Sequence, residues 1–279
     1  MYCELKESDL DGFKEKMILD ERSLATIEKY IRDVKSFLTF LGGRELTRLE
    51  VLKYKEHLSD KYAVRSANSM LAALNSFLKY IGQDSLCVKQ FKLQREAFSS
   101  ESRELSREEY VRLVECAKEG GDEGTALLIQ TICATGIRVS EIGFITVEAL
   151  RAGVATVNCK GKRRRILIVK NLCKKLLKYA KMQSIVSGAV FLSPRGSAIS
   201  RHTVWRKMKM ICKKCGVALG KAFPHNLRHL FARSFYEKER DIVKLADVLG
   251  HASIDTTRLY VITTGAEHRR LLEGLGLLC

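Results

Sequence analysis

Six side chains in the second half of the sequence have the types that phosphate chemistry needs. In chain order they are Arg138, Lys160, His225, Arg228, His251 and Tyr260. Cutting a phosphodiester without a metal requires cations that neutralise the negative charge of the transition state, a nucleophile, and an acid for the leaving oxygen. Arginines, a lysine, histidines and a tyrosine together meet these requirements. The set therefore indicates nucleophilic cleavage of a phosphate ester.

The two arginines are the candidates for holding the phosphate. A guanidinium group is planar, can bind two phosphate oxygens at once and keeps its charge near neutral pH, so lysine is not an equivalent replacement. We therefore expect Arg138 and Arg228 to form a phosphate clamp. Glu141 lies three residues after Arg138. We expect it to orient that arginine or the local turn rather than act as a base, because a carboxylate repels an anionic substrate.

The segments that carry these residues together resemble the tyrosine recombinase (phage integrase) family. They are ATGIRVSE at 134–141, KGK at 160–162, HNLRH at 225–229, and LGH at 249–251 followed nine positions later by Tyr260. Each motif alone recurs by chance, but all four occur in the family's order and near its spacings. The resemblance covers the chain. It implies a helical core-binding domain followed by a catalytic domain, as in an Xer-like recombinase or a small mobile-element integrase.

By this resemblance, Tyr260 attacks the scissile phosphate, forms a 3′-phosphotyrosyl bond and releases a 5′-hydroxyl. Later attack by a 5′-hydroxyl reseals the strand without ATP, metal or other cofactor, and the sequence has no G-x-x-x-x-G-K-[ST] loop. Lys160 would protonate the leaving oxygen, while His225 and His251 would bind the phosphate and assist proton transfer at the tyrosine. Cys159 stands where many relatives have glycine, so Lys160 is preferred as the acid only because it matches the family's lysine.

Metal binding is the alternative for some of these side chains. His225 and His229 lie four residues apart, a spacing found in zinc sites on helices. However, no acidic third ligand is in sight and Arg228 lies between them, so we expect no metal. Cys212 and Cys215 form a C-x-x-C pair without a second pair, which is more typical of ordinary helical thiols.

Two other functions stay open for this sequence. A type IB-like DNA topoisomerase shares the tyrosine chemistry but relaxes DNA without pairing sites. A catalytically silent DNA-binding regulator would use the same scaffold without cleavage. The complete catalytic set argues against the regulator, and the helical front region favours site-specific recombination over relaxation.

The charge distribution points to a polyanionic partner. The chain of 279 residues has 49 Lys and Arg against 32 Asp and Glu, a formal net charge of +17. Between Glu148 and Glu237 there is no acidic residue, whereas 21 Lys and Arg fall in that interval. Such a stretch needs an external polyanion to relieve its self-repulsion. Because aromatic residues are not interleaved with the basic runs, double-stranded DNA is the expected partner.

Six residues of this acid-free stretch are predicted to contact DNA. They are Lys162, Arg163, Arg164, Arg165, Arg201 and Lys207. By the resemblance, four protomers would act on two DNA sites through a Holliday junction, so we expect a homo-oligomer that is a tetramer on DNA. The apolar segment LLEGLGLL near the end of the chain would dock on a neighbouring protomer. An accessory directionality protein is a further candidate partner.

The hydrophobic pattern predicts a mainly α protein with a small β-sheet, an α+β fold. Apolar residues recur at helical spacing in the front third, which predicts helices at 7–17, 23–41, 48–59 and 66–81. Further helices are expected at 107–117, 124–134, 172–182, 202–215, 227–237, 241–249 and 266–275. Two strands at 154–158 and 165–169 would form a hairpin whose turn is the basic segment CKGKRR.

A polar segment, SSESRE, separates the two halves of the pattern. The predicted domains are therefore a SAM-like core DNA-binding domain at 1–98, a linker at 99–105 and a catalytic domain at 106–279. Thr47 with Glu50, and Ser106 with Glu109, are capping-box pairs that mark helix starts.

The location expected for this chain is the cytoplasm of a bacterium, or of the host of a phage or mobile element, with no membrane partner. No run approaches the about 20 apolar residues that span a bilayer. The start, MYCELKESDLDG, is acidic where a secretory signal would be basic and then apolar. Nine cysteines without a regular framework favour reduced thiols.

Overall fold

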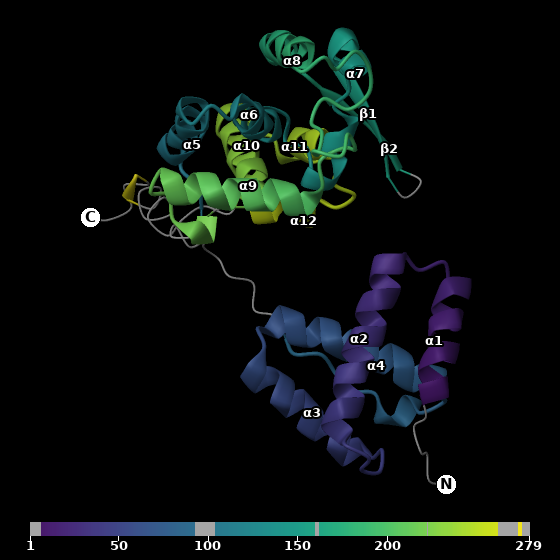
Figure 1. Ribbon diagram of the computed structural model, residues 1–279. Coiled ribbons are helices and arrows are strands. Elements are labelled where there is room, and N and C mark those ends of the chain that lie inside the picture. Colours follow the sequence, from purple (N-terminus) through teal and green to yellow (C-terminus); the bar gives the residue numbers. More distant parts are fainter. Residues whose placement is uncertain (1–6, 93–103, 160–161, 222, 262–272, 275–279) are drawn as a thin grey trace. The chain divides into compact units, whose positions relative to one another are not determined.

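Helices dominate the structure, and the described sheet is one two-stranded antiparallel hairpin, as Figure 1 shows for this computed structural model. The structure describes residues 7–92, 104–159, 162–221, 223–261 and 273–274. The chain divides into two units, Met1–Arg95 and Glu96–Cys279. The predicted mainly α fold with a small sheet is confirmed. The boundary predicted after Phe98 falls among residues 93–103, outside the described residues, and stays a prediction.

The front unit contains the four predicted helices and one short 3₁₀ helix. They are α1 (Glu7–Leu19), α2 (Leu24–Leu41), α3 (Arg48–Lys61), α4 (Val64–Tyr80) and η1 (Asp84–Leu86). The apolar faces of α2 and α4 pack together, and aromatic pairs lock the neighbouring helices onto them. Phe13 meets Phe77 edge-on at 5.4 Å between ring centroids, and Phe37 meets Tyr54 in the same way at 5.0 Å. Such aromatic contacts add to the stabilisation from buried area.

The two predicted capping boxes have different outcomes. At Ser106 the box is complete, because its hydroxyl accepts from the Glu109 N–H and the Glu109 carboxylate accepts from the Ser106 N–H. At Thr47 the hydroxyl accepts from the Glu50 N–H at 3.3 Å. The Glu50 carboxylate instead pairs with Arg44 and Lys53. Nearby cations therefore compete with the capping interaction for this carboxylate.

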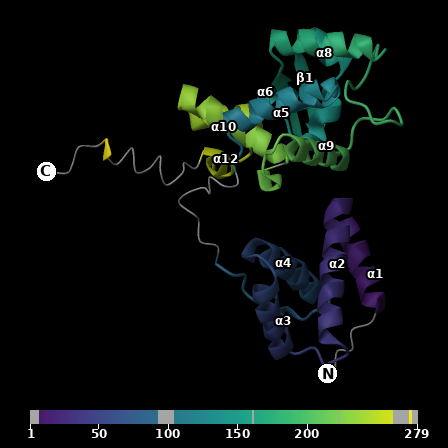
Figure 2. The ribbon, with the colours of Figure 1, turned by 60° about the vertical axis from the view of Figure 1, so that its left-hand side comes forward.

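The second unit has further helices around the hairpin. In chain order its elements are α5 (Arg107–Glu119), α6 (Glu123–Thr135), η3 (Val139–Phe144), α7 (Val147–Ala152), β1 (Val154–Cys159), β2 (Lys162–Leu167), α8 (Lys170–Met182), α9 (Arg201–Lys214), η4 (Leu219–Lys221), α10 (Pro224–Glu239), α11 (Ile242–Leu249) and α12 (Ile254–Val261). Helix α6 lies beside both α5 and α10 (Figures 1 and 2). Leu127, Ile129 and Ile132 of α6 are at most 1% exposed, so this helix is the centre of the core.

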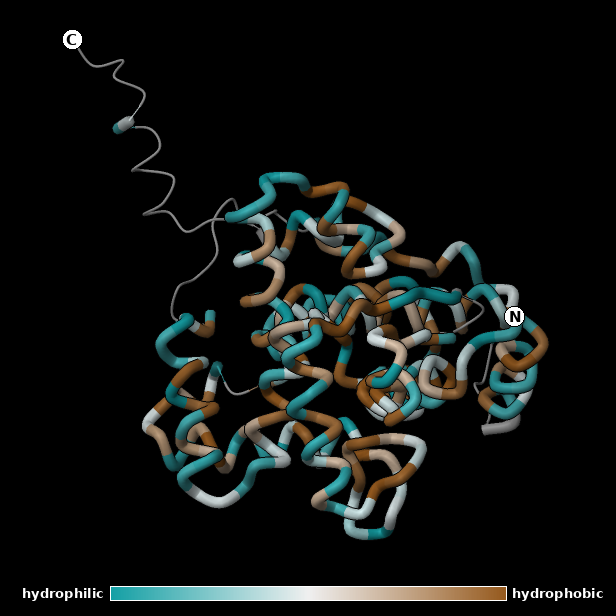
Figure 3. Tube along the Cα trace, turned by 90° about the horizontal axis from the view of Figure 1, so that it is seen from above, coloured by the Kyte–Doolittle hydropathy of each residue, from teal (hydrophilic) through white to brown (hydrophobic). Residues whose placement is uncertain are grey.

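Apolar residues recur along the helices of both units, where brown and teal alternate in Figure 3. This alternation is the signature of helices that bury one face. Among the described residues, no helix is long and apolar enough to cross a membrane.

The hairpin differs from its prediction. Residues of β1 and β2 pair antiparallel from Val154 with Leu167 to Cys159 with Lys162. The second strand was expected at 165–169 after a long basic turn, but it begins at Lys162. The extended pairing therefore takes up most of the basic run, and only residues 160–161, outside the described residues, separate the strands. A strand alternates its faces, so alternate basic residues point inward and outward.

Five of the described elements were not predicted, namely η1, η3, α7, η4 and α12, each of at most eight residues. Segments this short give too few turns for a clear helical period. Of the helix predicted at 266–275, only Glu273 and Gly274 are among the described residues.

Candidate active site

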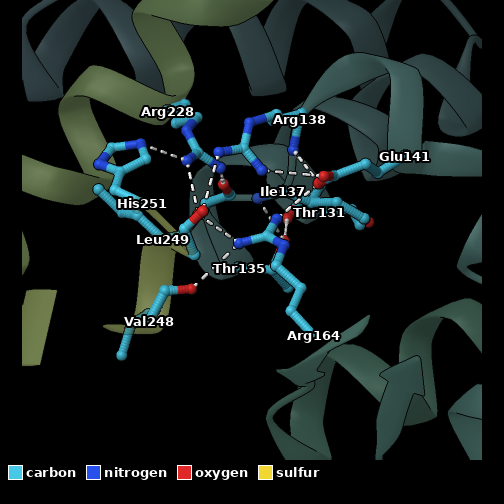
Figure 4. Close-up of polar contacts among 12 residues, drawn as sticks. Thr131, Thr135, Ile137, Arg138, Glu141, Arg164, Arg228, Val248, Leu249 and His251 are labelled. Carbon is cyan, nitrogen blue, oxygen red and sulfur yellow. Dashed lines mark hydrogen bonds and ion pairs between the residues drawn. The ribbon is translucent and has the colours of Figure 1, made fainter. Parts of the chain in front are cut away.

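The first arginine of the site follows a helix end that glycine makes possible. Helix α6 stops at Gly136, which has a left-handed conformation with φ 61°. Arg138 then leads into η3 (Figure 4). Its Nη1 donates to Glu141 Oε1 at 3.0 Å, its backbone N–H donates to Glu141 Oε2 at 3.0 Å, and its Nη2 donates to the Gly250 carbonyl at 3.2 Å. The prediction that Glu141 orients Arg138 is confirmed.

The second arginine is buried. Arg228, on α10, is 1% exposed. Its Nη1 donates to the Gly136 carbonyl, and its Nη2 to the Leu249 carbonyl at 2.8 Å. Burial, followed by the charge of Arg138, lowers the pKa of Arg228 to about 10. The guanidinium is therefore still charged at neutral pH, and hydrogen bonds to carbonyls offset part of the cost of burying it.

The bonding of His251 fixes the position of its proton. Arg228 Nη2 lies 2.9 Å from His251 Nε2, and His251 Nδ1 lies 2.9 Å from Thr257 Oγ1 (Figure 4 shows the first of these contacts). Because a guanidinium only donates, Nε2 must accept, and the ring proton is assigned to Nδ1. Thr257 therefore receives a hydrogen bond from the imidazole. This threonine was not among the predicted residues, and nothing in the motif identifies it.

Tyr260, on α12, lies among three histidines. The tyrosine is 7% exposed. Its ring stacks on His229, with 4.3 Å between centroids and an angle of 25°. The rings of His225 and His251 lie at 5.3 Å and 5.2 Å. The Arg228 guanidinium carbon lies 5.8 Å from the tyrosine ring centroid. The predicted motif residues therefore enclose this tyrosine.

The histidines are held in the neutral form. Burial, followed by the charges of Arg228 and Arg138, lowers the pKa of His251 to about 4. Burial, followed by His225 and Arg228, lowers the pKa of His229 to about 4 as well. Burial first, and then the charges of Arg228 and Arg138, also lower the pKa of His225. A neutral imidazole has one N–H donor and one acceptor nitrogen, so it can form a hydrogen bond with a tyrosine hydroxyl or with a phosphate oxygen.

The two histidines considered for zinc pack against the tyrosine instead. His225 and His229 meet edge-on at 4.8 Å between centroids, and both contact Tyr260. Within the part of the chain that the structure describes, no group of three or more His, Cys, Asp or Glu is arranged to hold a metal. His229 was considered only as a zinc ligand. Its place within HNLRH is the signal that could have identified it as a neighbour of the tyrosine.

The structure brings five of the six predicted catalytic residues together: Arg138, His225, Arg228, His251 and Tyr260. Lys160 lies outside the described residues.

The predicted DNA contacts separate into two groups. Arg163, Arg165 and Arg201 are exposed. The side chain of Lys162 lies outside the described residues. Arg164 differs from these three arginines, because its side chain is only 15% exposed and forms an ion pair with Glu141.

Lys207 also has partners within the protein, and its contact with DNA stays a prediction. Its Nζ lies 2.9 Å from Asp122 Oδ2 and 3.0 Å from Thr125 Oγ1. Lys207 is thus paired with an acidic residue that lies outside the acid-free stretch. Counting charges along the sequence could not reveal this pair.

Comparison with known proteins connects both units to one family. The Phage integrase family model matches residues 103–266, and the model of the phage integrase N-terminal SAM-like domain matches residues 10–83. The tyrosine recombinase XerA of Pyrococcus horikoshii is 30% identical over 97% of this chain and 94% of its own. The tyrosine recombinase XerD of Halalkalibacterium halodurans is 28% identical over 89% of this chain and 91% of its own.

Solved structures agree with this assignment. A lambda integrase dimer bound to a COC′ core site has a TM-score of 0.75 at 20% identity, over 93% of this chain and 77% of that one. The XerA recombinase crystal structure has a TM-score of 0.54 at 25% identity, over 98% and 99%. These relatives give no support to a topoisomerase. Because one family model spans more than half of the sequence, the chain belongs to the phage integrase family of tyrosine recombinases.

Proposed function

We propose that this site-specific recombinase cleaves double-stranded DNA with Tyr260 as its nucleophile. The observation that carries the proposal is the enclosure of this one tyrosine by His225, His229, His251 and the Arg228 guanidinium. The Tyr260 oxygen would attack the scissile phosphorus and lose its proton. A 3′-phosphotyrosyl bond would form, the bond from phosphorus to the 5′-oxygen would break, and that oxygen would gain a proton.

Arg138 and Arg228 are the proposed phosphate clamp. Arg228 keeps a buried Nε without a hydrogen-bond partner among the described residues. The side chain of Arg138 is 39% exposed, so it is accessible to a ligand. Two fixed cations stabilise the negative charge that develops in the transition state, and they need no reorganisation to do so. In many enzymes such preorganised charges supply most of the rate enhancement.

Proton transfer is assigned to neutral histidines and a lysine. We propose that His225 and His251 bind the phosphate and assist loss of the tyrosine proton, because their rings lie 5.3 Å and 5.2 Å from the Tyr260 ring. To do so, His251 would exchange one of its present partners, Arg228 or Thr257, for the phosphate. Lys160 is proposed as the acid for the leaving 5′-oxygen on the family resemblance alone. The reverse attack by a 5′-hydroxyl would then reseal the strand with no ATP.

The test is capture of SDS-resistant protein–DNA adducts from cells, followed by sequencing of the attached DNA. Wild type should give adducts at a few sites, and Tyr260→Phe none, at equal DNA occupancy. Tyr62→Phe is the matched control, because Tyr62 lies exposed in the other unit. Adducts that persist in Tyr260→Phe would refute the assignment. Full occupancy without adducts in wild type would favour a silent regulator.

We propose a homotetramer on paired DNA sites as the active assembly, with strand exchange through a Holliday junction. One structural neighbour is a lambda integrase tetramer bound to a Holliday junction. Of the predicted docking segment at the end of the chain, only Glu273 and Gly274 are among the described residues. Deletion of Gly265–Cys279 should leave single-site binding intact and abolish site pairing in a gel-shift assay. Pairing by the shortened chain would refute the docking role. An accessory directionality protein stays a prediction from the resemblance.

Exposed Arg163, Arg165 and Arg201 are the proposed phosphate contacts outside the catalytic set. Each is an exposed guanidinium in the acid-free stretch. Contacts of this kind fix the register of a protein on duplex DNA without reading its sequence.

A further inference from the structure

We infer that Arg164 is a positioning residue of the active site, which holds Glu141, Arg138 and the end of α11 in the arrangement that cleavage requires. The inference rests on the proposed function of the site. It gives a separate role to one member of a basic run that is otherwise uniform in sequence.

Arg164 differs from its neighbours in burial. Its side chain is 15% exposed, whereas Arg163 and Arg165 on either side are exposed. Strand alternation explains the difference, because Arg164 shares the inward face of β2 with Ile166, which is 3% exposed. A charged group that is turned inward on a strand must find partners inside the protein.

The first partner is the carboxylate that also holds Arg138. Arg164 Nη2 lies 2.5 Å from Glu141 Oε2. Glu141 Oε1 accepts from Arg138 Nη1, and Glu141 Oε2 accepts from the Arg138 N–H, both at 3.0 Å (Figure 4). One carboxylate thus bridges two guanidinium groups.

This bridge has an electrostatic consequence. If Glu141 paired with Arg138 alone, the two charges would cancel at the phosphate site. With Arg164 present, the three groups carry a net positive charge, so Arg138 can be oriented by a carboxylate and still attract a phosphate. The site thereby combines orientation with an electropositive field.

The second set of partners lies at the end of α11. Arg164 Nη1 donates to the Leu249 carbonyl at 2.5 Å and to the Val248 carbonyl at 3.2 Å. The Leu249 carbonyl also accepts from Arg228 Nη2 at 2.8 Å. Two residues further along, His251 contacts Arg228 as well. Arg164 therefore helps to fix the segment that carries His251.

Gly250 fits this contact. It has a left-handed conformation with φ 62°, and a Cβ at this position would lie 2.4 Å from Arg164 Cδ. The chain approaches the arginine stem so closely that only glycine leaves room. The glycine of the LGH motif is thus required partly by the side chain of Arg164, which comes from strand β2.

Single-turnover cleavage at saturating DNA tests the inference, with the dissociation constant measured separately. Arg164→Gln should slow cleavage by about 100-fold, the size expected for a misplaced catalytic group, with less than about a threefold change in DNA affinity. Arg164→Lys, which keeps the charge, should recover part of the rate. Arg112→Gln removes an exposed charge on α5, outside the acid-free stretch, and should match wild type.

Arg165→Gln tests the alternative that this strand only binds DNA. It should weaken binding, because Arg165 faces outward. The inference is overturned if Arg164→Gln weakens binding and leaves the rate at saturation unchanged. A wild-type protein that forms no adduct would instead refute the proposed function.

A double-mutant cycle locates the effect. Arg164→Gln and Glu141→Gln remove the two ends of one contact, so the double variant should be slowed about as much as the slower single variant. Effects that multiply would overturn the inference. If thermal unfolding shows that Arg164→Gln does not fold, the cycle is run with Arg164→Lys. If the rate defect of Arg164→Lys were the same with and without Glu141→Gln, the inference would also be overturned.

A substrate with sulfur in place of the leaving 5′-oxygen separates positioning from acid catalysis, because a thiolate leaves without a proton. The Arg164→Gln defect should persist with this substrate, whereas a defect in Lys160→Met should largely disappear. Recovery of Arg164→Gln would show that it acts through the acid and would overturn the assignment to Glu141 and α11.

Discussion

Arg228 keeps a full charge at a position as buried as the leucines of the core. Its side chain is 1% exposed, and two backbone carbonyls and His251 surround its guanidinium. A buried cation is costly unless hydrogen bonds replace those lost to water. Because the neighbours are neutral carbonyls and an imidazole, its charge is solvated but not cancelled. The positive potential therefore remains available to a phosphate beside Tyr260.

Substitution Arg228→Lys should reduce the rate of adduct formation by about 100- to 1,000-fold, the cost of removing one such fixed donor. A single ammonium cannot reach both carbonyls and a phosphate as the planar guanidinium can. The rate is measured by quenching with SDS over time at saturating DNA. Arg112→Lys, on an exposed face of α5, is the control and should keep the wild-type rate. Equal rates for Arg228→Lys and wild type would contradict the clamp.

The neutral histidines predict how stability depends on pH. The pKa of His229 and that of His251 are both lowered to about 4 in the folded chain, with burial as the first cause, whereas an unfolded histidine titrates near about 6.5. Between these values the unfolded state binds more protons, so stability falls as pH falls from about 6.5 to about 4. Calorimetry should therefore give a falling melting temperature for the catalytic unit over this range.

His229→Gln should weaken that pH dependence, because the amide does not titrate. His57→Gln, an exposed histidine of the front unit, should leave it unchanged. A melting temperature that is flat between pH 6.5 and 4.5, or one equally steep in His229→Gln, would show that the buried histidine is not the titrating group.

At the scale of elements, two helix ends place side chains of the proposed active site. Helices α6 and α11 both stop at a glycine with positive φ, Gly136 and Gly250. Arg138 follows the first by two residues and His251 follows the second directly. The carbonyls of these turns accept from Arg228 and Arg138. Glycine caps of this kind let the chain reverse sharply after a helix.

Substitution Gly136→Ala should lower the free energy of unfolding by about 2 to 4 kcal/mol, because positive-φ strain adds to overpacking. A Cβ there would lie 2.5 Å from Phe231 Cδ1 and 3.0 Å from Leu249 Cδ2. Gly121→Ala isolates the strain, since φ is 72° but nothing lies within 4 Å. It should cost about 1 to 2 kcal/mol. Urea denaturation measures both, and equal losses would rule out the steric contribution.

The elements also show what a sequence can reveal. The apolar stripe of α2 and the Ser106 capping box are local signals, and both predicted their helices. The spacing of the four motifs predicted the residues around Tyr260, because proteins that share these motifs share a fold that brings them together. By contrast, Arg164 is one of four equivalent cations as far as the sequence alone can tell. Its role depends on strand register and on carbonyls more than 80 positions away in the sequence, which no local pattern contains.

At the scale of the whole molecule, the formal net charge is +17. Its basic residues fall into those that bind partners within the protein and those that are exposed to solvent. Among the described residues of the acid-free stretch, several basic residues have partners in the protein: Arg164, Lys175, Lys207, Lys209, Lys221, Arg228 and Arg233. The exposed cations of the same stretch are therefore the ones proposed to bind DNA. Counting charges along the sequence alone overstates the number of cations that have no partner within the protein.

This division predicts the salt dependence of DNA binding. With about 6 to 10 phosphate contacts, affinity should fall about 1,000-fold or more between 50 and 200 mM salt. Fluorescence anisotropy over a salt series measures the slope of log affinity against log salt. A variant with Arg163, Arg165 and Arg201 changed to Gln should reduce the magnitude of this slope by about 2 to 3. Lys207→Gln removes the same kind of charge, but one already paired with Asp122, so its slope should equal that of wild type. If Lys207→Gln lowered the slope as much as the change of one exposed arginine, the ion pair with Asp122 would have to open on DNA. Pairing within the protein would then not decide which cations bind DNA.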